Sequence, residues 1–173
     1  MALMHTSYKK IRKTVSEIST VPGLGVVELS DRLGISRDLA LLRVCDMMDA
    51  GLVYYNGKGD GMISINLSEA GFKFNRINTN LPGVSNLDPL KFSTVGTCVK
   101  IIAENPGILA GSVAEKMRGH EPNVADPARA LFRAAIATKV KPSDGHANGS
   151  RDKACFITMD GRELYEVYSS LKV

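Results

Sequence analysis

The sequence is poor in the residues that build metal centres and disulfide frameworks. Its 173 residues include only three cysteines, Cys45, Cys98 and Cys155, and these stand far apart. No Cys-x-x-Cys pair and no cluster of cysteine with histidine occurs, so neither a zinc site nor a disulfide framework is indicated. An odd number of distant cysteines predicts reduced thiols, which favours a cytoplasmic location.

Long apolar runs are missing as well. No stretch of the chain approaches the roughly 18 consecutive apolar residues of a membrane helix. The first four residues are too few for the apolar region of a signal peptide. We therefore expect no membrane-spanning segment and no membrane partner. Hydrophobic residues still make up 44% of the chain, which is enough for a globular core.

Motifs of catalysis and of nucleotide binding are also absent. The sequence holds no Gly-x-x-x-x-Gly-Lys-Ser/Thr loop, and Gly57-Lys58-Gly59 falls in a predicted hairpin tip instead of preceding a helix. The histidines, His5, His120 and His146, fall in predicted loops or at a terminus, where a surface role is the simplest interpretation. Acidic residues are scattered, with no pair in an apolar setting. We therefore expect no enzyme, no cofactor and no metal ligands.

The stretch over residues 26–74 holds the clearest succession of elements. An amphipathic segment over residues 27–33 leads into Gly34, a residue type that allows the positive φ of a tight turn between helices. Ser36 then predicts the N-cap of a helix over residues 37–50 (Arg37 to Ala50), which Gly51 ends.

A hairpin and a closing helix complete this stretch. Residues 52–55 are apolar and aromatic, residues 56–61 form a turn cluster, and residues 62–67 alternate apolar with polar side chains. Ser68 predicts the cap of a helix that ends near Ile77. Helix, turn, helix, hairpin and helix in this order resembles the winged-helix family.

The second part of the chain repeats this order. Asn, Pro, Gly and Ser dominate residues 78–89, so we expect a linker over residues 79–92 between a first domain, 1–78, and a second, 93–173. We predict helices over 93–104, 109–117 and 128–138, strands over 140–142 and 154–159, and a last helix capped by Asp160. The segments 65–68 and 157–160 each end a strand at a predicted cap, and we interpret them as equivalent positions of an internal repeat.

The expected fold is α+β and mainly helical, with two tandem winged-helix domains, each a three-to-four-helix unit with a β-hairpin wing. The resemblance implies that residues 37–50 and 126–138 are recognition helices for a DNA major groove, with wings over 56–61 and 143–152. Such a role needs Arg or Lys for phosphates, and Arg, Asn or Gln for base edges. The DNA-binding candidates are Arg37, Arg43, Lys58, Asn123, Arg129, Arg133, Lys139, Lys141, Arg151 and Lys153.

The two predicted recognition helices differ in character. At 100° steps, the face of the first helix opposite its predicted core carries acidic residues and leucines. Of these, Leu39, Leu42 and Asp46 suit contact with a protein, including a second copy of the chain, better than contact with phosphates. The second helix carries Arg129 and Arg133 one turn apart, which favours DNA, although arginines that only solvate a helix would give the same pattern.

The net charge of +4 permits an acidic partner without requiring one. We expect a sequence-specific double-stranded DNA-binding protein, in the simplest case a small transcriptional regulator that acts by site occupancy and associates with the nucleoid. Two alternatives stay open. One is a protein–protein interaction module of a larger complex built on winged helices, with Arg37 to Ala50 as its contact. The other is a small replication or partition initiator.

Overall fold

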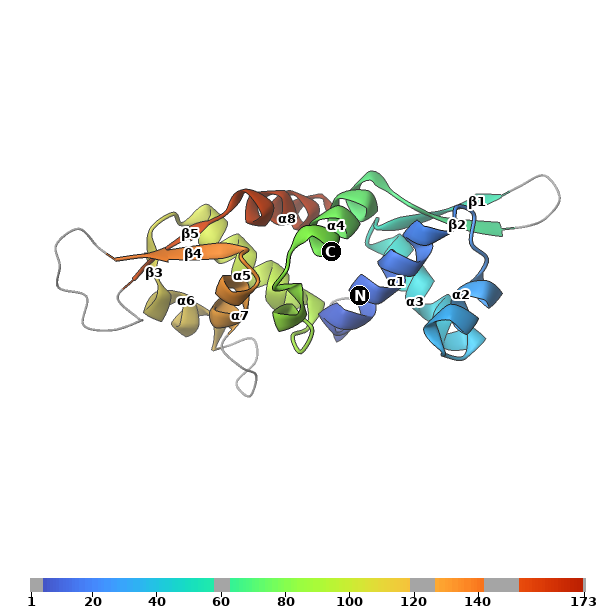
Figure 1. Cartoon of the computed structure of the whole chain (residues 1–173), viewed down its shortest axis with the longest axis horizontal. Helices are drawn as coiled ribbons and strands as arrows, with labels where there is room; N and C mark the ends of the chain where they lie inside the picture. Colours follow the sequence, from blue (N-terminus) through green and yellow to red (C-terminus); the bar gives the residue numbers. More distant parts are fainter. Residues whose placement is uncertain (1–4, 58–62, 119–126, 142–152, 173) are drawn as a thin grey trace.

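The computed structural model of the chain describes residues 5–57, 63–118, 127–141 and 153–172. This described part is α+β and mostly helical, as expected, and it is compatible with a winged-helix-like fold (Figure 1). None of its helices is long and apolar enough to cross a membrane. The first part of the chain contains α1 (Tyr8–Thr20), α2 (Val26–Leu33), α3 (Arg37–Asp49), β1 (Val53–Gly57), β2 (Ile63–Leu67) and α4 (Glu69–Asn80).

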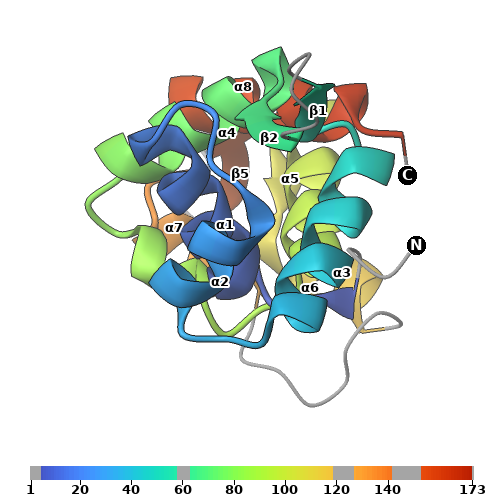
Figure 2. The ribbon, with the colours of Figure 1, turned by 90° about the vertical axis from the view of Figure 1, so that its right-hand side faces the viewer.

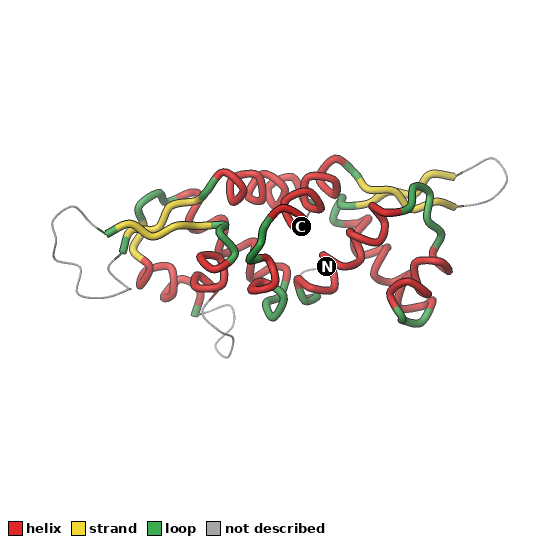
Figure 3. The backbone as a smooth tube through the Cα atoms, in the orientation of Figure 1, coloured by secondary structure: helices red, strands yellow, loops and turns green. Residues whose placement is uncertain are grey.

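The remaining elements follow in a matching order. They are the 3-10 helix η2 (Val84–Leu87), α5 (Phe92–Glu104), β3 (Ile108–Leu109), α6 (Ala110–Met117), α7 (Pro127–Arg133), β4 (Ala137–Val140), β5 (Ala154–Ile157) and α8 (Met159–Ser170). Strands lie toward the two ends of the elongated molecule, and α4 and α8 meet along its middle (Figure 3).

Local signals in the first part act as the sequence predicts. Gly34 ends α2 in the left-handed region, with φ of 63°. The Ser36 hydroxyl accepts a hydrogen bond from the Leu39 amide at 3.3 Å and so caps α3. Ser68 likewise accepts from the Gly71 amide at 3.1 Å and caps α4. These predicted helix starts are confirmed.

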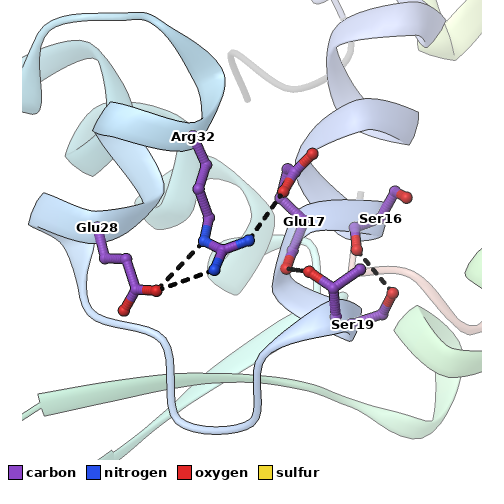
Figure 4. Close-up of polar contacts among 6 residues, drawn as sticks. Ser16, Glu17, Ser19, Glu28 and Arg32 are labelled. Atoms are coloured by element: carbon purple, nitrogen blue, oxygen red, sulfur yellow. Dashed lines mark hydrogen bonds and ion pairs between the residues drawn. The ribbon is translucent and has the colours of Figure 1, made fainter.

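An ion-pair bridge adds to the packing of α2 against α1. The Arg32 guanidinium of α2 lies 3.2 Å from Glu28 on its own helix and 3.7 Å from Glu17 on α1 (Figure 4). The hydroxyl of Ser19 donates to the Ser16 carbonyl close by. Because these charges are partly exposed, the bridge contributes little stability.

The first half of the molecule, α1 to α4, and the second half, η2 to α8, each contain a small antiparallel sheet. Strands β1 and β2 pair with Tyr55 opposite Ile65, and Leu24 adds a single bridge to Ile65. In the second sheet, of order β3-β5-β4, Lys139 lies opposite Cys155, and β3 pairs with β5 on its other side. The strand β3 therefore pairs with β5 in the same way as Leu24 pairs with β2 in the first half, but over two residues instead of one.

Helix α7 is shorter than the sequence predicts. The expected helix over 128–138 ends at Arg133, Ala135 takes a positive φ of 58°, and β4 starts at Ala137, whereas the sequence predicts a strand only at 140–142. The reason is tertiary. The Ile136 carbonyl accepts from the Thr158 amide at 3.1 Å, which draws this segment into the second sheet against its helix propensity.

The cap of the last helix is also two residues earlier than predicted. The Thr158 hydroxyl, and not Asp160, accepts from the Gly161 amide at 3.1 Å, and Asp160 lies in the first turn of α8. Thr158 is therefore the equivalent of Ser68. The segment that matches 65–68 is 155–158, and not 157–160 as the sequence predicts.

The two caps share a tight packing arrangement. A Cβ on Gly71 would lie 2.1 Å from the Leu52 carbonyl oxygen, and a Cβ on Gly161 would lie 2.1 Å from that of Ile136. In both halves only glycine lets the first turn of the helix pack directly on the backbone that leads into the hairpin.

The segment expected to be a linker is folded. Helix α4 continues to Asn80, η2 follows, and the side chains that point inward from this segment are all buried: Leu81, Val84, Leu87 and Leu90. Gly83 lies so close to the Arg133 carbonyl that no side chain fits there. The proline and asparagine content of residues 79–92 therefore marks turns that pack against α7 and not an open connection.

The two halves meet around a pair of matched backbone hydrogen bonds. The Tyr8 amide donates to the Leu90 carbonyl and the Phe92 amide donates to the Thr6 carbonyl, both at 2.8 Å. Tyr8 and Phe92 begin α1 and α5, and their rings stack with centroids 6.2 Å apart. Each of these two bonds is thus the counterpart of the other, as in an approximate two-fold arrangement about this point. In the end-on view of Figure 2 the first half of the molecule lies in front of the second.

Further contacts surround this joint. Phe74 of α4 packs edge-on against the Tyr8 and Phe92 rings. The ring centroid of Tyr168 of α8 lies 4.7 Å from that of Phe92. The Tyr168 hydroxyl donates to the Phe92 carbonyl at 2.9 Å. The helices that carry these rings, α1, α4, α5 and α8, therefore share one hydrophobic core.

The glycine contact gives a first prediction. Gly71→Ala should destabilise the protein by about 3 kcal/mol, because the new methyl group collides with the Leu52 backbone. Gly57→Ala is the matched control, since nothing lies within 4 Å of its added Cβ, and it should change the free energy of unfolding by less than about 0.5 kcal/mol. Urea unfolding of both variants measures the difference, and equal effects would contradict the packing.

The aromatic joint gives a second prediction. Phe92→Ala should cost about 3–5 kcal/mol because it opens a cavity between the halves. The intact chain should unfold in a single transition, as one cooperative core requires. Two separate transitions in calorimetry, with only one of them shifted by Phe92→Ala, would show that the halves unfold independently.

Candidate nucleic-acid interface

The exposed surface of α7 is basic. Arg129 and Arg133 lie one turn apart and are exposed, whereas Ala128, Ala130 and Leu131 between and beside them are buried. This phase follows from the helical period, because the two arginines share one face and the small apolar residues the other. Two guanidinium groups therefore project from one side of a short helix.

Lysines of the neighbouring sheet lie next to this helix. The Lys139 ammonium of β4 lies 4.1 Å from the centroid of the Phe132 ring of α7, a cation–π contact. Lys141 follows β4 and Lys153 precedes β5, and the register of Val140 opposite Ala154 puts these two residues on adjacent strands at the same end of the sheet. Five of the predicted cations therefore lie on α7 or on the ends of the adjoining strands β4 and β5: Arg129, Arg133, Lys139, Lys141 and Lys153.

Three predicted DNA contacts lie outside the described residues. These are Lys58, Asn123 and Arg151, which belong to the two predicted wing tips and to the turn before α7. Of the two predicted recognition helices, α7 is thus described from Pro127 onward and α3 is described in full.

The surface of α3 has a different chemistry. Ala40, Val44 and Met47 are fully buried, so the predicted core face is confirmed. Leu39 and Leu42 are 44% and 57% exposed, as the helical phase predicts. Three further positions on this helix are acidic and lie at least partly at the surface: Asp38, Asp46 and Asp49.

The two arginines of α3 have different surroundings. Arg37 is exposed at the start of the helix. Arg43 is half-buried, and its guanidinium donates to the Thr14 hydroxyl of α1 at 3.2 Å. Loss of hydration around Arg43 lowers its pKa, although the group stays charged. Arg43 therefore joins α3 to α1, and Arg37 is the α3 arginine that faces solvent.

Sequence reasoning missed an apolar surface beside α3. Leu41 is 44% exposed, Val27 of α2 is 53% exposed and Ile63 of β2 is 59% exposed. They belong to a groove of about 580 Å³, which we name the α2–α3 groove. Its lining residues are Gly25, Val26, Val27, Arg37, Leu41, Cys45, Tyr55 and Ile63. The sequence signal for it is weak, because its residues come from four separate elements, α2, α3, β1 and β2.

Metal-ligating side chains do not gather in the described ranges. No group of three or more His, Cys, Asp or Glu side chains in the described residues could hold a metal ion. Cys98 and Cys155 are buried, and Cys45 is exposed in the α2–α3 groove. His5 is exposed, and His120 and His146 lie outside the described residues.

No protein-family model matches the sequence, and no curated protein matches it.

Proposed function

We propose that this chain is a sequence-specific double-stranded DNA-binding protein, a small transcriptional regulator that acts by occupying its site. We further propose that its halves are two tandem winged-helix units and that the second one reads DNA. The observation that carries the proposal is the basic surface formed by Arg129 and Arg133 of α7 together with the lysines of the adjoining sheet.

The arrangement of α6, α7 and the second sheet supports a winged-helix interpretation. Helix α6 precedes α7, as the first helix of a helix-turn-helix does, and the β4–β5 pair lies in the position of a wing. In that geometry the second helix enters the major groove and the wing follows the backbone beside it. Arg129 and Arg133 then face base edges, whereas Lys141 and Lys153 face phosphates.

The cation–π contact supports the same geometry. Lys139 lies over Phe132, so its ammonium is held at the boundary between α7 and the sheet. A helix and a wing that touch the same duplex must keep a fixed distance, and a contact between them helps to keep it. The chain carries a net charge of only +4, so affinity would depend on this local placement and not on bulk charge.

A second candidate function has its own observation. The exposed leucines of α3, Leu39, Leu41 and Leu42, stand among acidic side chains and favour a protein contact, including a homodimer. In that case the chain is an interaction module of a larger complex, and α3 is its contact helix. A replication or partition initiator would use the same DNA chemistry as a regulator.

The DNA proposal gives a third prediction. Arg129→Ala should lower affinity for the specific site by about 1–3 kcal/mol if the side chain reads a base. Lys153→Ala should weaken specific and random DNA alike and reduce the salt dependence by about one unit, because one phosphate contact is lost. Lys73→Ala on α4, where Lys73 pairs with Glu69, is the matched control and should bind as wild type. Gel shift at two salt concentrations measures all three.

Two outcomes decide against DNA binding. Absence of any salt-dependent binding by the intact chain at micromolar concentration in low-salt buffer contradicts the proposal. Equal losses of DNA affinity for Lys73→Ala and Arg129→Ala would show that the loss does not arise at the surface of α7.

Asn substitutions at Asp46 and Asp49 should leave DNA binding unchanged or improve it, since they remove charges that repel phosphate.

The protein-contact alternative gives a fourth prediction. If α3 is the contact of a homodimer, Leu42→Arg should convert the dimer to a monomer, because an exposed leucine is replaced by a charge in an apolar interface. Arg129→Ala should then leave the dimer intact. Sedimentation equilibrium at several concentrations measures both, and a monomeric wild-type chain would exclude the homodimer.

A further inference from the structure

The α2–α3 groove occupies the position in the first half that the basic surface occupies in the second. The Leu52 amide donates to Met47 as the Ile136 amide donates to Leu131, so Cys45 and Arg129 are equivalent positions. The strand registers make two more pairs equivalent: Tyr55 with Lys139, and Ile63 with Lys153. At matched positions, three cations of the second half are replaced by a thiol, a phenol and an isoleucine.

The size and lining of this groove suit a small molecule. Its volume of about 580 Å³ falls within the range of roughly 300–1,000 Å³ that is typical of small-ligand sites. Val26, Leu41 and Ile63 supply an apolar wall from α2, α3 and β2. The polar groups are few and come from Arg37, Cys45 and Tyr55, as in sites where polar contacts fix the orientation of an apolar ligand.

The Tyr55 hydroxyl is a buried donor without a partner. Its oxygen is buried, and no described residue forms a hydrogen bond with it. Loss of hydration raises the pKa of Tyr55, and the neighbouring Cys45 thiol adds to the shift, although the two groups do not meet in a hydrogen-bond geometry. The phenol is therefore protonated at neutral pH. A buried hydroxyl costs free energy unless something accepts its hydrogen, and a ligand in the groove would supply that acceptor.

Arg37 gives the groove a positive charge. It is exposed at the first turn of α3 and forms no ion pair within the described ranges. Its guanidinium is a cation with the planar fork that matches a carboxylate. An apolar groove with one cation and one buried donor is complementary to an apolar molecule with one acidic end.

We propose that the α2–α3 groove binds a small amphipathic carboxylic acid, with its apolar body against Val26, Leu41 and Ile63 and its carboxylate held by Arg37 and by a hydrogen bond from Tyr55. The site does not depend on DNA binding by the second half. A protein segment or a second copy of the chain would also cover an apolar surface. However, the unpartnered Tyr55 hydroxyl and the charge of Arg37 both call for one compact acceptor group.

The test is calorimetric titration of the full chain with octanoate and, in parallel, with the neutral 1-octanol. Octanoate should bind saturably with one site per chain. Arg37→Gln should weaken octanoate about tenfold and leave octanol unchanged, since only the charge is lost. Tyr55→Phe should also weaken octanoate about tenfold. Its thermal midpoint should equal or exceed that of wild type, because the lost hydroxyl has no protein partner.

Matched controls separate the groove from general effects. Tyr54→Phe changes the neighbouring tyrosine, which does not line the groove, and Arg133→Gln removes an exposed arginine of α7. Both should bind octanoate as wild type does. Ile63→Lys puts into the groove the residue type that the second half carries at Lys153, and it should abolish the binding of octanol.

Three results would overturn the proposal. The first is the absence of saturable octanoate binding. The second is an equal loss of affinity in Tyr54→Phe and Tyr55→Phe. The third is a concentration-dependent dimer that Ile63→Lys dissolves and that octanoate does not compete with, because the groove would then be a contact between two copies of the chain.

Discussion

The joint at the start of α1 and α5 determines how the rest of the molecule is arranged. Two backbone hydrogen bonds of 2.8 Å, from Tyr8 to Leu90 and from Phe92 to Thr6, connect equivalent positions of the two halves. Because each bond is the counterpart of the other, the halves must face each other, and α4 and α8 pack side by side across the middle (Figure 1). The β1–β2 sheet and the β3-β5-β4 sheet then lie toward opposite ends, so any partner that touches both sheets must be long.

The joint also buries two polar atoms at a cost in free energy. The Tyr8 hydroxyl and the Asn78 carbonyl oxygen are buried and form no hydrogen bond with a described residue. Burial raises the pKa of both Tyr8 and Tyr168, so both phenols stay neutral across the physiological range. Stacked and edge-on contacts among their rings and those of Phe74 and Phe92 offset the cost of the unpaired groups. The two halves therefore share a core whose centre is aromatic and uncharged.

Features that depend on a few neighbouring residues were predictable from the sequence. Gly34 with its positive φ, and Ser36 and Ser68 as helix caps, have the expected geometry because a cap or a turn needs only the next three residues. The errors all lie where distant segments meet. Ala135 leaves the helix because Thr158 pairs with Ile136, and Thr158 instead of Asp160 becomes the cap because its hydroxyl also donates to the Ala135 carbonyl at 2.8 Å. Residues 79–92 read as a linker because their prolines and asparagines mark turns, and the leucines that bury them carry no periodic signal.

The same division applies to the candidate sites. Residue type and helical phase were enough to identify Arg129 and Arg133 as an exposed pair. They were not enough to show that Arg43 is held by Thr14 of α1 or that Lys139 lies over Phe132, since each depends on a partner from another element. The α2–α3 groove was missed for that reason too. The two halves have equivalent helix caps and equivalent close-packed glycines. At equivalent positions, however, the second half carries a cationic surface and the first half an apolar groove. The two proposals therefore assign different partners to equivalent backbone positions, because a cationic surface attracts phosphates and an apolar groove favours a molecule whose body loses water on binding.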